Sequence, residues 1–401
     1  MHVTRRGSQI LIDVAVLEPA GRLYGSEYSL LDLIDGLPRD DFRWRVYLPP
    51  NNGFDRLLED RRVPIDPVYP RDLASAGRVG RASLYAKILF RLWRHRPDVL
   101  YVNQTGSMRS AALYAKRLGL PMVVQVQTLE DARWISEREA LHRNVMAFIC
   151  NSDFIARQTR VDPQRKCVAY YGIPADRAGA AVTHHHTRAQ ASPKRVESDT
   201  IRFALLGRIA ESKGHYLLLD ALERLRADAF PLKIKIIGEG LTKQETRRFE
   251  ASVAKRGVED VFEFRGYQSD IAAELSDVDL LLIPSIAEPL GRVLYDAAEL
   301  GVPVIASDAG GLGEVCQRFD IGVQFASQNA EALAAAMKHA SKDLVAVTDQ
   351  FQRQALEMMR RLNPANYFEH MAEMLRRTAE RKPTSFEWFG SDAVDKRNVH
   401  G

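Results

Sequence analysis

The sequence predicts an α/β protein of two domains, each a parallel β-sheet covered by helices. Short apolar runs alternate with longer segments of helical periodicity in both halves of the chain, and strands joined by helices pair in parallel through right-handed crossovers. The 401 residues are enough for two domains with separate cores. Between the halves, residues 175–200 lose periodicity and are rich in Ala, His, Arg, Ser and Pro, as in a linker or flexible insertion. We therefore place the domains at 1–174 and 201–362, and a final helix with a tail at 363–401.

The composition is ordinary for a soluble globular protein, with 46% hydrophobic and 27% charged residues. No run approaches the roughly 18 apolar residues of a membrane span. Asp13 interrupts the first apolar run and no small-residue cleavage site follows it, so a first strand explains this run better than a signal peptide. Cys150, Cys167 and Cys316 are widely spread and odd in number, which predicts buried, reduced thiols and a cytoplasmic protein.

The net charge of +4 is mild, but basic residues gather in one stretch of the N-terminal half. Residues 83–95, SLYAKILFRLWRH, predict a basic amphipathic helix with Trp93 near its end. Two interpretations are open. The helix either lies on an anionic membrane leaflet, on the inner face of the membrane, or packs on the sheet with its arginines in water. We expect no nucleic-acid partner.

Five strands are predicted in the N-terminal half, at 9–17, 42–48, 98–102, 121–126 and 148–153. Ligands of parallel sheets bind beyond the carboxyl ends of the strands, and Gln127 stands at such an end. A loop with Gly21 and Gly25 follows the first strand. Because these glycines are four residues apart, the fingerprint G-x-G-x-x-G is absent, and a hydride-transfer cofactor is not expected. Ser26 as a helix cap is the alternative to a ligand role for this loop.

The most informative stretch runs over residues 280–315 and reads LLLIPSIAEPLGRVLYDAAELGVPVIASDAGGLGEV. It predicts a strand, an acidic loop, a helix from Leu290 and a second strand. Pro289 suits a first helical position. The N–H groups of Leu290, Gly291 and Arg292 would then favour an anion such as a diphosphate. Glu288 at the same mouth would be repelled by phosphate and is better suited to accept hydrogen bonds from sugar hydroxyls.

This stretch resembles the signature of family 4 of the retaining glycosyltransferases, over the pattern S-x-x-E-P-L-G-x-x-x-x-D-A-x-x-x-G-V-P-V-I-A-S-D-x-G-G. The family has the GT-B architecture, in which two Rossmann-like domains face each other across a cleft and the final helix crosses back to the N-terminal domain. Its first acid contacts the donor sugar, which implies that role for Glu288. The second acid, a glutamate in the family, holds the ribose. Asp296 stands there, one methylene shorter.

Further segments carry the resemblance. Gly207-Arg208 and Lys213-Gly214 are similar to the family motif G-R-x-x-x-x-K-G, whose two cations grip the donor diphosphate, and such cations would stabilise the departing nucleoside diphosphate. The resemblance implies that Gly25 approaches the donor phosphates or the acceptor, and that the backbone near Tyr267 reads the base. Gln127 occupies the place of a frequent histidine, and Tyr171 that of a frequent asparagine.

Two segments have features of metal-binding motifs. Asp277-Val278-Asp279 has the form D-x-D, but Asp279 opens a buried strand directly, and Arg208 and Lys213 already supply positive charge. The adjacent histidines 184–186 cannot easily share one tetrahedral site, so a solvated loop is the better interpretation. We therefore expect no metal and no cofactor besides the nucleotide-sugar co-substrate.

The resulting hypothesis is a retaining hexosyltransferase that moves a sugar from a nucleoside diphosphate to a hydroxyl of a sugar or lipid-linked acceptor, in polysaccharide or glycolipid assembly. Loops at residues 22–24 and 108–109 would contact the acceptor. The alternative is a GT-B scaffold or binding protein that has lost catalysis, for which Gln127 and Asp296 are the grounds.

Overall fold

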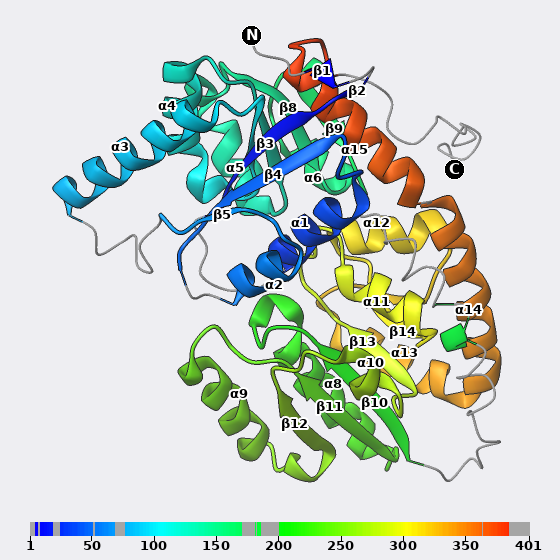
Figure 1. The fold of residues 1–401 in the computed structure, drawn as a ribbon. Helices are drawn as coiled ribbons and strands as arrows, with labels where there is room; N and C mark the ends of the chain where they lie inside the picture. Colours follow the sequence, from blue (N-terminus) through cyan, green and yellow to red (C-terminus); the bar gives the residue numbers. More distant parts are fainter. Residues whose placement is uncertain are drawn as a thin grey trace. The chain divides into compact units, whose positions relative to one another are not determined.

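The computed structural model describes residues 5–6, 9–18, 25–50, 53–68, 77–170, 181, 183–185, 200–362 and 364–384 (Figure 1). The chain forms two compact units, one of Met1–Pro174 with Pro364–Gly401 and one of Ala175–Asn363. Each unit has its own parallel sheet, as the sequence predicts. Some residues discussed above lie outside the described part of the chain, namely Gly21, residues 22–24, Tyr171 and His186.

The first unit contains a parallel sheet with the strand order β5-β4-β3-β6-β7-β8-β9. A separate antiparallel pair, β1 (Arg5–Arg6) and β2 (Gln9–Ile10), precedes it. The strands of the sheet are β3 (Ile12–Leu17), β4 (Phe42–Tyr47), β5 (Ile65–Asp66), β6 (Val99–Val102), β7 (Met122–Val126), β8 (Val145–Cys150) and β9 (Lys166–Val168).

Helices cover both faces of this sheet because the central strands are apolar on both sides. Val14 and Val16 of β3 belong to a core that includes residues of α1 and α15, whereas Ala15 and Leu17 belong to a core with residues of α3, α4, α5 and α6. The helices are α1 (Gly25–Gly36), α2 (Phe54–Asp60), α3 (Arg78–His95), α4 (Met108–Leu118), α5 (Leu129–Ser136), α6 (Asp153–Gln158) and α15 (Pro364–Ala379), with short 3₁₀ helices η1 (Thr105–Ser107), η2 (Glu139–Leu141) and η3 (Pro163–Arg165).

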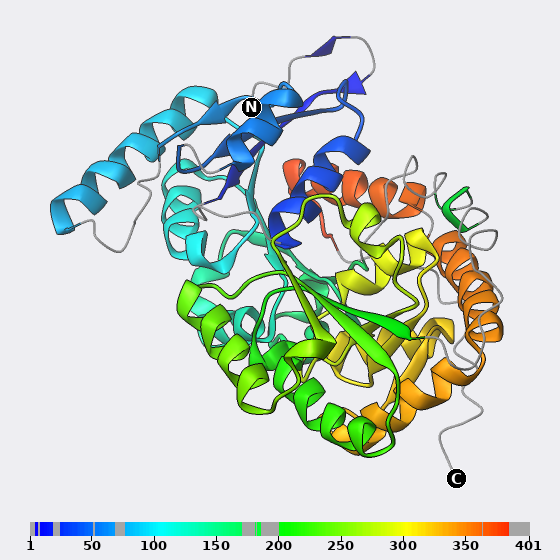
Figure 2. The same ribbon diagram turned by 90° about the horizontal axis from the view of Figure 1, so that it is seen from below.

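The second unit contains a parallel sheet with the order β12-β11-β10-β13-β14-β15, and Figure 2 shows these green to yellow strands between helices. β10 lies in the middle, so the chain reverses its direction of strand addition between β12 and β13. Ligands of open α/β sheets bind at such a switch point. The strands are β10 (Ile201–Leu206), β11 (Leu232–Ile237), β12 (Phe262–Gly266), β13 (Leu280–Ile283), β14 (Val304–Ser307) and β15 (Val323–Phe325).

Helices α8 and α13 share one core with β10, β11 and β13, while α11 contacts β13 and α12 contacts β14. The helices of this unit are α8 (His215–Ala227), α9 (Lys243–Lys255), α10 (Ile271–Leu275), α11 (Arg292–Leu300), α12 (Gly310–Phe319), α13 (Ala330–Lys342) and α14 (Leu344–Arg361), with 3₁₀ helices η4 (Glu211–Lys213) and η5 (Glu259–Val261). No helix among the described residues has the length and apolar character that crossing a bilayer requires.

The prediction of a solvated histidine loop is wrong for His185. Residues 183–185 are helical, His185 is 4% exposed, and its Nε2 lies 2.7 Å from the carbonyl oxygen of Ala298. The last carbonyls of a helix have no partner within the helix. His185 supplies one at the end of α11, which explains why it is buried.

Candidate active site

The diphosphate-binding loop predicted after β10 begins with Gly207 and Arg208. Gly207 has φ 138°, and no heavy atom lies within 4 Å of the position that a Cβ would take. The backbone of the loop is fixed to β11, since Gly207 N donates to Ile237 O at 2.9 Å and Ile209 N to Glu239 O at 3.0 Å. Arg208 is exposed, and no described residue pairs with its guanidinium. A rigid backbone thus presents an uncompensated cation beside open space.

The same loop continues through η4 and is locked to the acidic loop after β13. Gly214 has φ 78°, and a Cβ there would lie 1.9 Å from the carbonyl oxygen of Pro284. Ile286 N also donates to Ser212 O at 2.9 Å. Only glycine permits this close approach. The lysine loop and the acidic loop, 70 residues apart in sequence between Gly214 and Pro284, therefore form one rigid assembly.

Behind the lysine loop lies a buried imidazole. His215 is 0% exposed, its Nδ1 lies 3.2 Å from Ala210 O, and its ring packs edge-on to Phe249. Burial lowers the pKa of His215 to about 4, a shift that the Ala210 carbonyl opposes and the charge of Lys213 favours. The imidazole is therefore neutral at pH 7, and because Nδ1 faces a carbonyl, it carries the proton and donates.

Glu288 and Lys213 are brought together by this assembly. Lys213 Nζ lies 2.5 Å from Glu288 Oε2, and Glu288 is 8% exposed. Ser285 Oγ donates to the same carboxylate oxygen at 3.0 Å, and Gly311 N donates to the backbone oxygen of Glu288 at 2.8 Å. No described residue bonds to the other oxygen, Oε1. The site thus offers a carboxylate oxygen and an ammonium side by side at the carboxyl edge of the sheet.

The next helix begins later than the expected start at Pro289 or Leu290. α11 begins at Arg292, with Gly291 as its N-cap at φ 86°, so Pro289 and Leu290 precede the helix. A Cβ on Gly291 would lie 2.8 Å from Leu312, and this packing holds the left-handed turn that interrupts the helical path. The N–H groups of Leu290 and Gly291 therefore do not belong to the helix. Asp296 is in its second turn and is partly buried.

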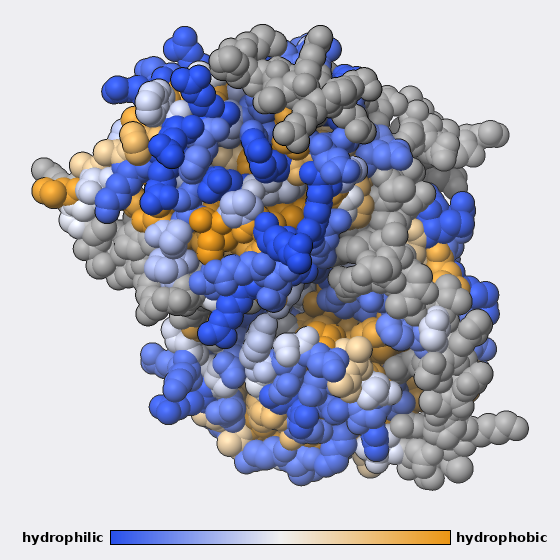
Figure 3. Space-filling model, in the orientation of Figure 1, coloured by the Kyte–Doolittle hydropathy of each residue, from blue (hydrophilic) through white to orange (hydrophobic). Residues whose placement is uncertain are grey.

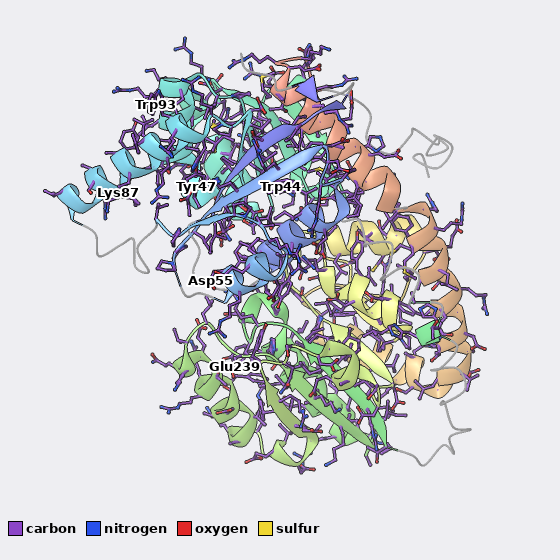
Figure 4. All side chains as sticks on the ribbon, viewed as in Figure 1. Trp44, Tyr47, Asp55, Lys87, Trp93 and Glu239 are labelled. Carbon is purple, nitrogen blue, oxygen red and sulfur yellow. The ribbon has the colours of Figure 1, made fainter. Side chains whose placement is uncertain are left out.

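The segment expected to read the base lies at the ends of β11 and β12. Gly238 N donates to Gly266 O at 2.8 Å, and Glu239, labelled in Figure 4, comes within 3.1 Å of the position of a Cβ on Gly266. Tyr267 is 57% exposed. A backbone turn with an exposed aromatic ring is suited to contact a planar base.

The two predicted site residues of the first unit lie at the carboxyl edge of its own sheet. Gly25 is exposed and is the first residue of α1. Gln127 follows β7, and its Nε2 donates to the backbone oxygen of Asn103 at 3.2 Å. Asn151 Nδ2 donates to Gln127 O at 3.0 Å. Gln127 is thus held by Asn103 and Asn151, and its side-chain amide carries no titratable proton.

Two buried acids lie at this edge, Glu18 and Glu27, which are 0% and 1% exposed. Sequence reasoning missed Glu18 and noted Glu27 only as part of the turn that begins at Gly25. Asn103 Nδ2 donates to Glu18 Oε2 at 2.7 Å, and Ser26 Oγ donates to Glu27 Oε2 at 2.8 Å. Glu18 and Asn103 each come directly after a buried strand, the same signal that identified Gln127, and it could have found them too.

The D-x-D motif lies at the opposite edge of the sheet of the second unit. Asp279 Oδ2 accepts a bond from Arg202 N at 2.7 Å, and Asp277 forms ion pairs with Lys235 at 2.6 Å and Arg202 at 3.2 Å. Both acids thus bind residues of the neighbouring strands β10 and β11 near the amino end of β13. Within the described ranges, no three His, Cys, Asp or Glu side chains are grouped so that they could hold a metal ion.

The predicted basic helix is α3, and the structure gives it two different faces. Ile88 and Leu92 are buried against the sheet, with 0% and 1% exposure. Val79, Phe90 and Trp93 are 85%, 58% and 55% exposed, and Figure 3 shows apolar and hydrophilic surface side by side at the left-hand end of this helix.

An ion pair and a hydrogen bond hold α3 to the sheet. Arg91 pairs with Asp66 of β5, and Tyr47 Oη lies 2.9 Å from His95 Nδ1. Figure 4 labels Tyr47, together with Lys87 and Trp93 of α3. The sheet-packed interpretation therefore holds for the inner face, while the outer face exposes aromatic side chains among basic ones.

Two sequence families match the chain. The family described as Glycosyl transferases group 1 matches residues 187–357, and Glycosyltransferase Family 4 matches residues 24–177. The glycogen synthase of Mycobacterium tuberculosis is 29% identical over 304 residues, covering 72% of this chain and 70% of that protein. The lipopolysaccharide core biosynthesis glycosyltransferase LpsE of Rhizobium meliloti is 23% identical over 324 residues, covering 80% and 87%.

A solved structure shares the fold. The crystal structure of Anabaena Alr3699/HepE in complex with UDP and glucose superposes with a TM-score of 0.74 at 20% sequence identity, covering 91% of this chain and 99% of that one. The likeness extends over both sheets, which confirms the predicted architecture of two Rossmann-like domains.

Proposed function

We propose that this chain, a glycosyltransferase of the family 4 type with the GT-B fold, uses a nucleotide sugar as donor and moves a hexose to a hydroxyl acceptor with retention of anomeric configuration. The observation that carries this proposal is the Lys213–Glu288 pair, whose lysine lies on the same loop as the exposed Arg208. It combines charges for a diphosphate with an acceptor for sugar hydroxyls. The names of the two relatives, a glycogen synthase and a lipopolysaccharide core transferase, favour an acceptor that is a growing glycan or a lipid-linked sugar.

In this mechanism Arg208 and Lys213 bind the diphosphate and stabilise the charge that develops as it leaves. Glu288 accepts hydrogen bonds from the sugar and Asp296 from the ribose. The bond between C1 and the acceptor oxygen forms on the face from which the C1–phosphate bond breaks. A phosphate oxygen of the departing group takes the acceptor's proton, so Gln127 need not carry one.

Replacement of Lys213 tests the proposal. Lys213→Ala should lower kcat/KM for the donor by about 10²-fold or more, because removing one preorganised donor from a developing oxyanion costs about 3 kcal/mol. Lys338→Ala is the matched control, since Lys338 is also an ion-paired lysine of this unit, bound to Asp228 on its surface. A Lys213→Ala enzyme with turnover near that of the Lys338→Ala enzyme would refute the assigned role.

Two further measurements complete the test. A panel of UDP-, GDP-, ADP- and TDP-glucose identifies the donor, and NMR of the product reports its anomeric configuration, for which inversion would refute the retaining mechanism. We also propose that the two cations replace a metal at the diphosphate. Activity should then survive dialysis against EDTA, and a loss restored by Mg²⁺ or Mn²⁺ would contradict this part.

A second proposal concerns location: the exposed face of α3 contacts an anionic membrane surface peripherally, from the cytoplasmic side. Phe90 and Trp93 can insert at the headgroup level while the exposed Lys87 and Arg94 meet anionic lipids. Protein should co-sediment with vesicles containing phosphatidylglycerol and less with phosphatidylcholine alone or in high salt.

The double variant Phe90→Ser/Trp93→Ser should bind phosphatidylglycerol vesicles about tenfold more weakly or worse, since each buried aromatic side chain contributes on the order of 1.5–3 kcal/mol. Val345→Ser is the control, because Val345 is a similarly exposed apolar residue, at 57%, on α14. Equal binding by the double variant and the control would exclude α3 as the contact.

A further inference from the structure

The carboxylate of Glu288 is held asymmetrically. Lys213 Nζ and Ser285 Oγ both donate to Oε2, at 2.5 and 3.0 Å. Among the residues that the structure describes, none bonds to Oε1. Because a carboxylate can only accept hydrogen bonds, the Ser285 hydroxyl must be the donor. One oxygen is thus anchored twice, and the other is left for a ligand.

Ser285 is itself fixed from behind. It is 1% exposed, and its backbone oxygen accepts a bond of 2.6 Å from Ser307 Oγ. Ser307 is 0% exposed and ends β14. Ser285 follows β13 by two residues, after Pro284. The buried hydroxyl of Ser307 therefore fixes the backbone of Ser285, and the buried hydroxyl of Ser285 holds the glutamate. Buried hydrogen bonds of this kind restrict side-chain orientation.

The two anchors of Oε2 differ in how they respond to the donor. Lys213 is the proposed diphosphate ligand, and an ammonium is attracted to phosphate as a point charge. The Ser285 hydroxyl carries no net charge and is not attracted to the phosphate in this way. If Lys213 moved to the diphosphate, Ser285 would still hold Oε2.

We propose that Ser285 is a positioning residue that keeps Oε2 occupied and so directs Oε1 of Glu288 at a hydroxyl of the donor sugar. This inference rests on the proposed function and adds to it a specific division of labour. The nucleoside diphosphate is recognised by the cations and the backbone, and the sugar by an oxygen whose direction depends on Ser285.

The test compares the binding of UDP and UDP-glucose by calorimetry, together with kcat and KM. Ser285→Ala should bind UDP within about twofold of wild type but should lose about tenfold or more of its affinity for UDP-glucose, the range expected when a hydrogen bond to a charged group is lost. Donor KM should rise with it. Ser285→Thr keeps the hydroxyl and should recover most of the sugar-dependent affinity.

Ser341→Ala is the control, since it removes a serine hydroxyl that bonds to Met337 O on α13, away from Glu288. Melting temperatures show whether each variant is folded. Equal losses for UDP and UDP-glucose in Ser285→Ala would indicate a merely structural role and overturn the inference, as would unchanged affinity for UDP-glucose. If wild type itself gains nothing from the glucose moiety, the sugar role of Glu288 fails first, and that result is distinguishable because it needs no variant.

Discussion

At the residue scale, His215 makes the stability of the second unit depend on pH. Burial lowers its pKa to about 4 in the folded protein, whereas an unfolded histidine titrates near 6.5. As the pH falls, the unfolded chain therefore binds the extra proton before the folded protein does. The contribution of neutral His215 to the free energy of unfolding is fully present above about pH 6.5 and is lost as the pH drops toward 4. The difference of roughly 2.5 pK units corresponds to about 3 kcal/mol.

His215→Leu should remove this dependence, although it also removes the contact of the ring with Ala210. The measurement is the difference in melting temperature between wild type and variant at pH 7.5 and pH 4.5. Wild type should have its larger advantage at pH 7.5. The control is His339→Gln at an exposed position of α13. A difference that is constant with pH would rule out a buried neutral imidazole.

The sequence indicated the residue types at the site better than their bonds. Arg208, Lys213 and Glu288 are in the segments that the motifs picked out, and their roles stay predictions. The ion pair between Lys213 and Glu288 joins residues 75 apart, and no local pattern encodes it. Ser285 was recognised only as the end of a strand, because the sequence does not show that its hydroxyl donates to Glu288.

At the scale of elements, most strands of the two sheets were predicted within a few residues, because both faces of a parallel sheet are buried and each strand is a short apolar run. The strands of two or three residues, β5, β9 and β15, were not predicted. The start of α11 was not. Pro289 is a good first helical residue in isolation, but the left-handed Gly291 packs against Leu312 of α12 and delays the helix to Arg292. Tertiary packing outweighed the local preference.

Gly214 provides a test of how tightly the two donor-site loops are joined. Gly214→Ala would place a methyl group 1.9 Å from the carbonyl oxygen of Pro284, in addition to the strain of φ 78°. Gly257 has φ 60° with no atom within 4 Å of the Cβ position. Gly257→Ala therefore isolates the backbone strain, about 1–2 kcal/mol for an L-residue in this conformation.

We expect the free energy of unfolding of Gly214→Ala to be lower than that of Gly257→Ala by roughly 1–3 kcal/mol, the cost of an overpacked site. Gly214→Ala should also lose donor affinity because Lys213 is displaced with the loop. Chemical unfolding and binding of UDP measure the two effects. Equal stability of the two variants would mean that the lysine loop and the acidic loop are not in rigid contact.

At the scale of the whole molecule, the last helix of the chain belongs to the first unit and not to the unit that precedes it in sequence. Met371 and Leu375 of α15 are 0% exposed in the core that contains Val14 and Val16. A Cβ on Gly36 would lie 2.3 Å from the ring of Phe368. The amphipathic pattern of residues 363–377 predicts the helix, but which sheet it covers came only from the family resemblance, since helical periodicity does not specify a partner.

Met371→Ala should consequently weaken the first unit and leave nucleotide binding in the second. Removing a buried methionine side chain costs about 2–5 kcal/mol, so the melting transition of the first unit should shift downward. Saturating UDP stabilises whatever binds it, and it should raise the transition of the second unit equally in wild type and variant. Leu356→Ala on α14, where Leu356 is 38% exposed, is the control that should change neither. If Met371→Ala abolished the UDP-dependent shift, α15 would have to stabilise the second unit, and the assignment of the helix to the first unit would be wrong.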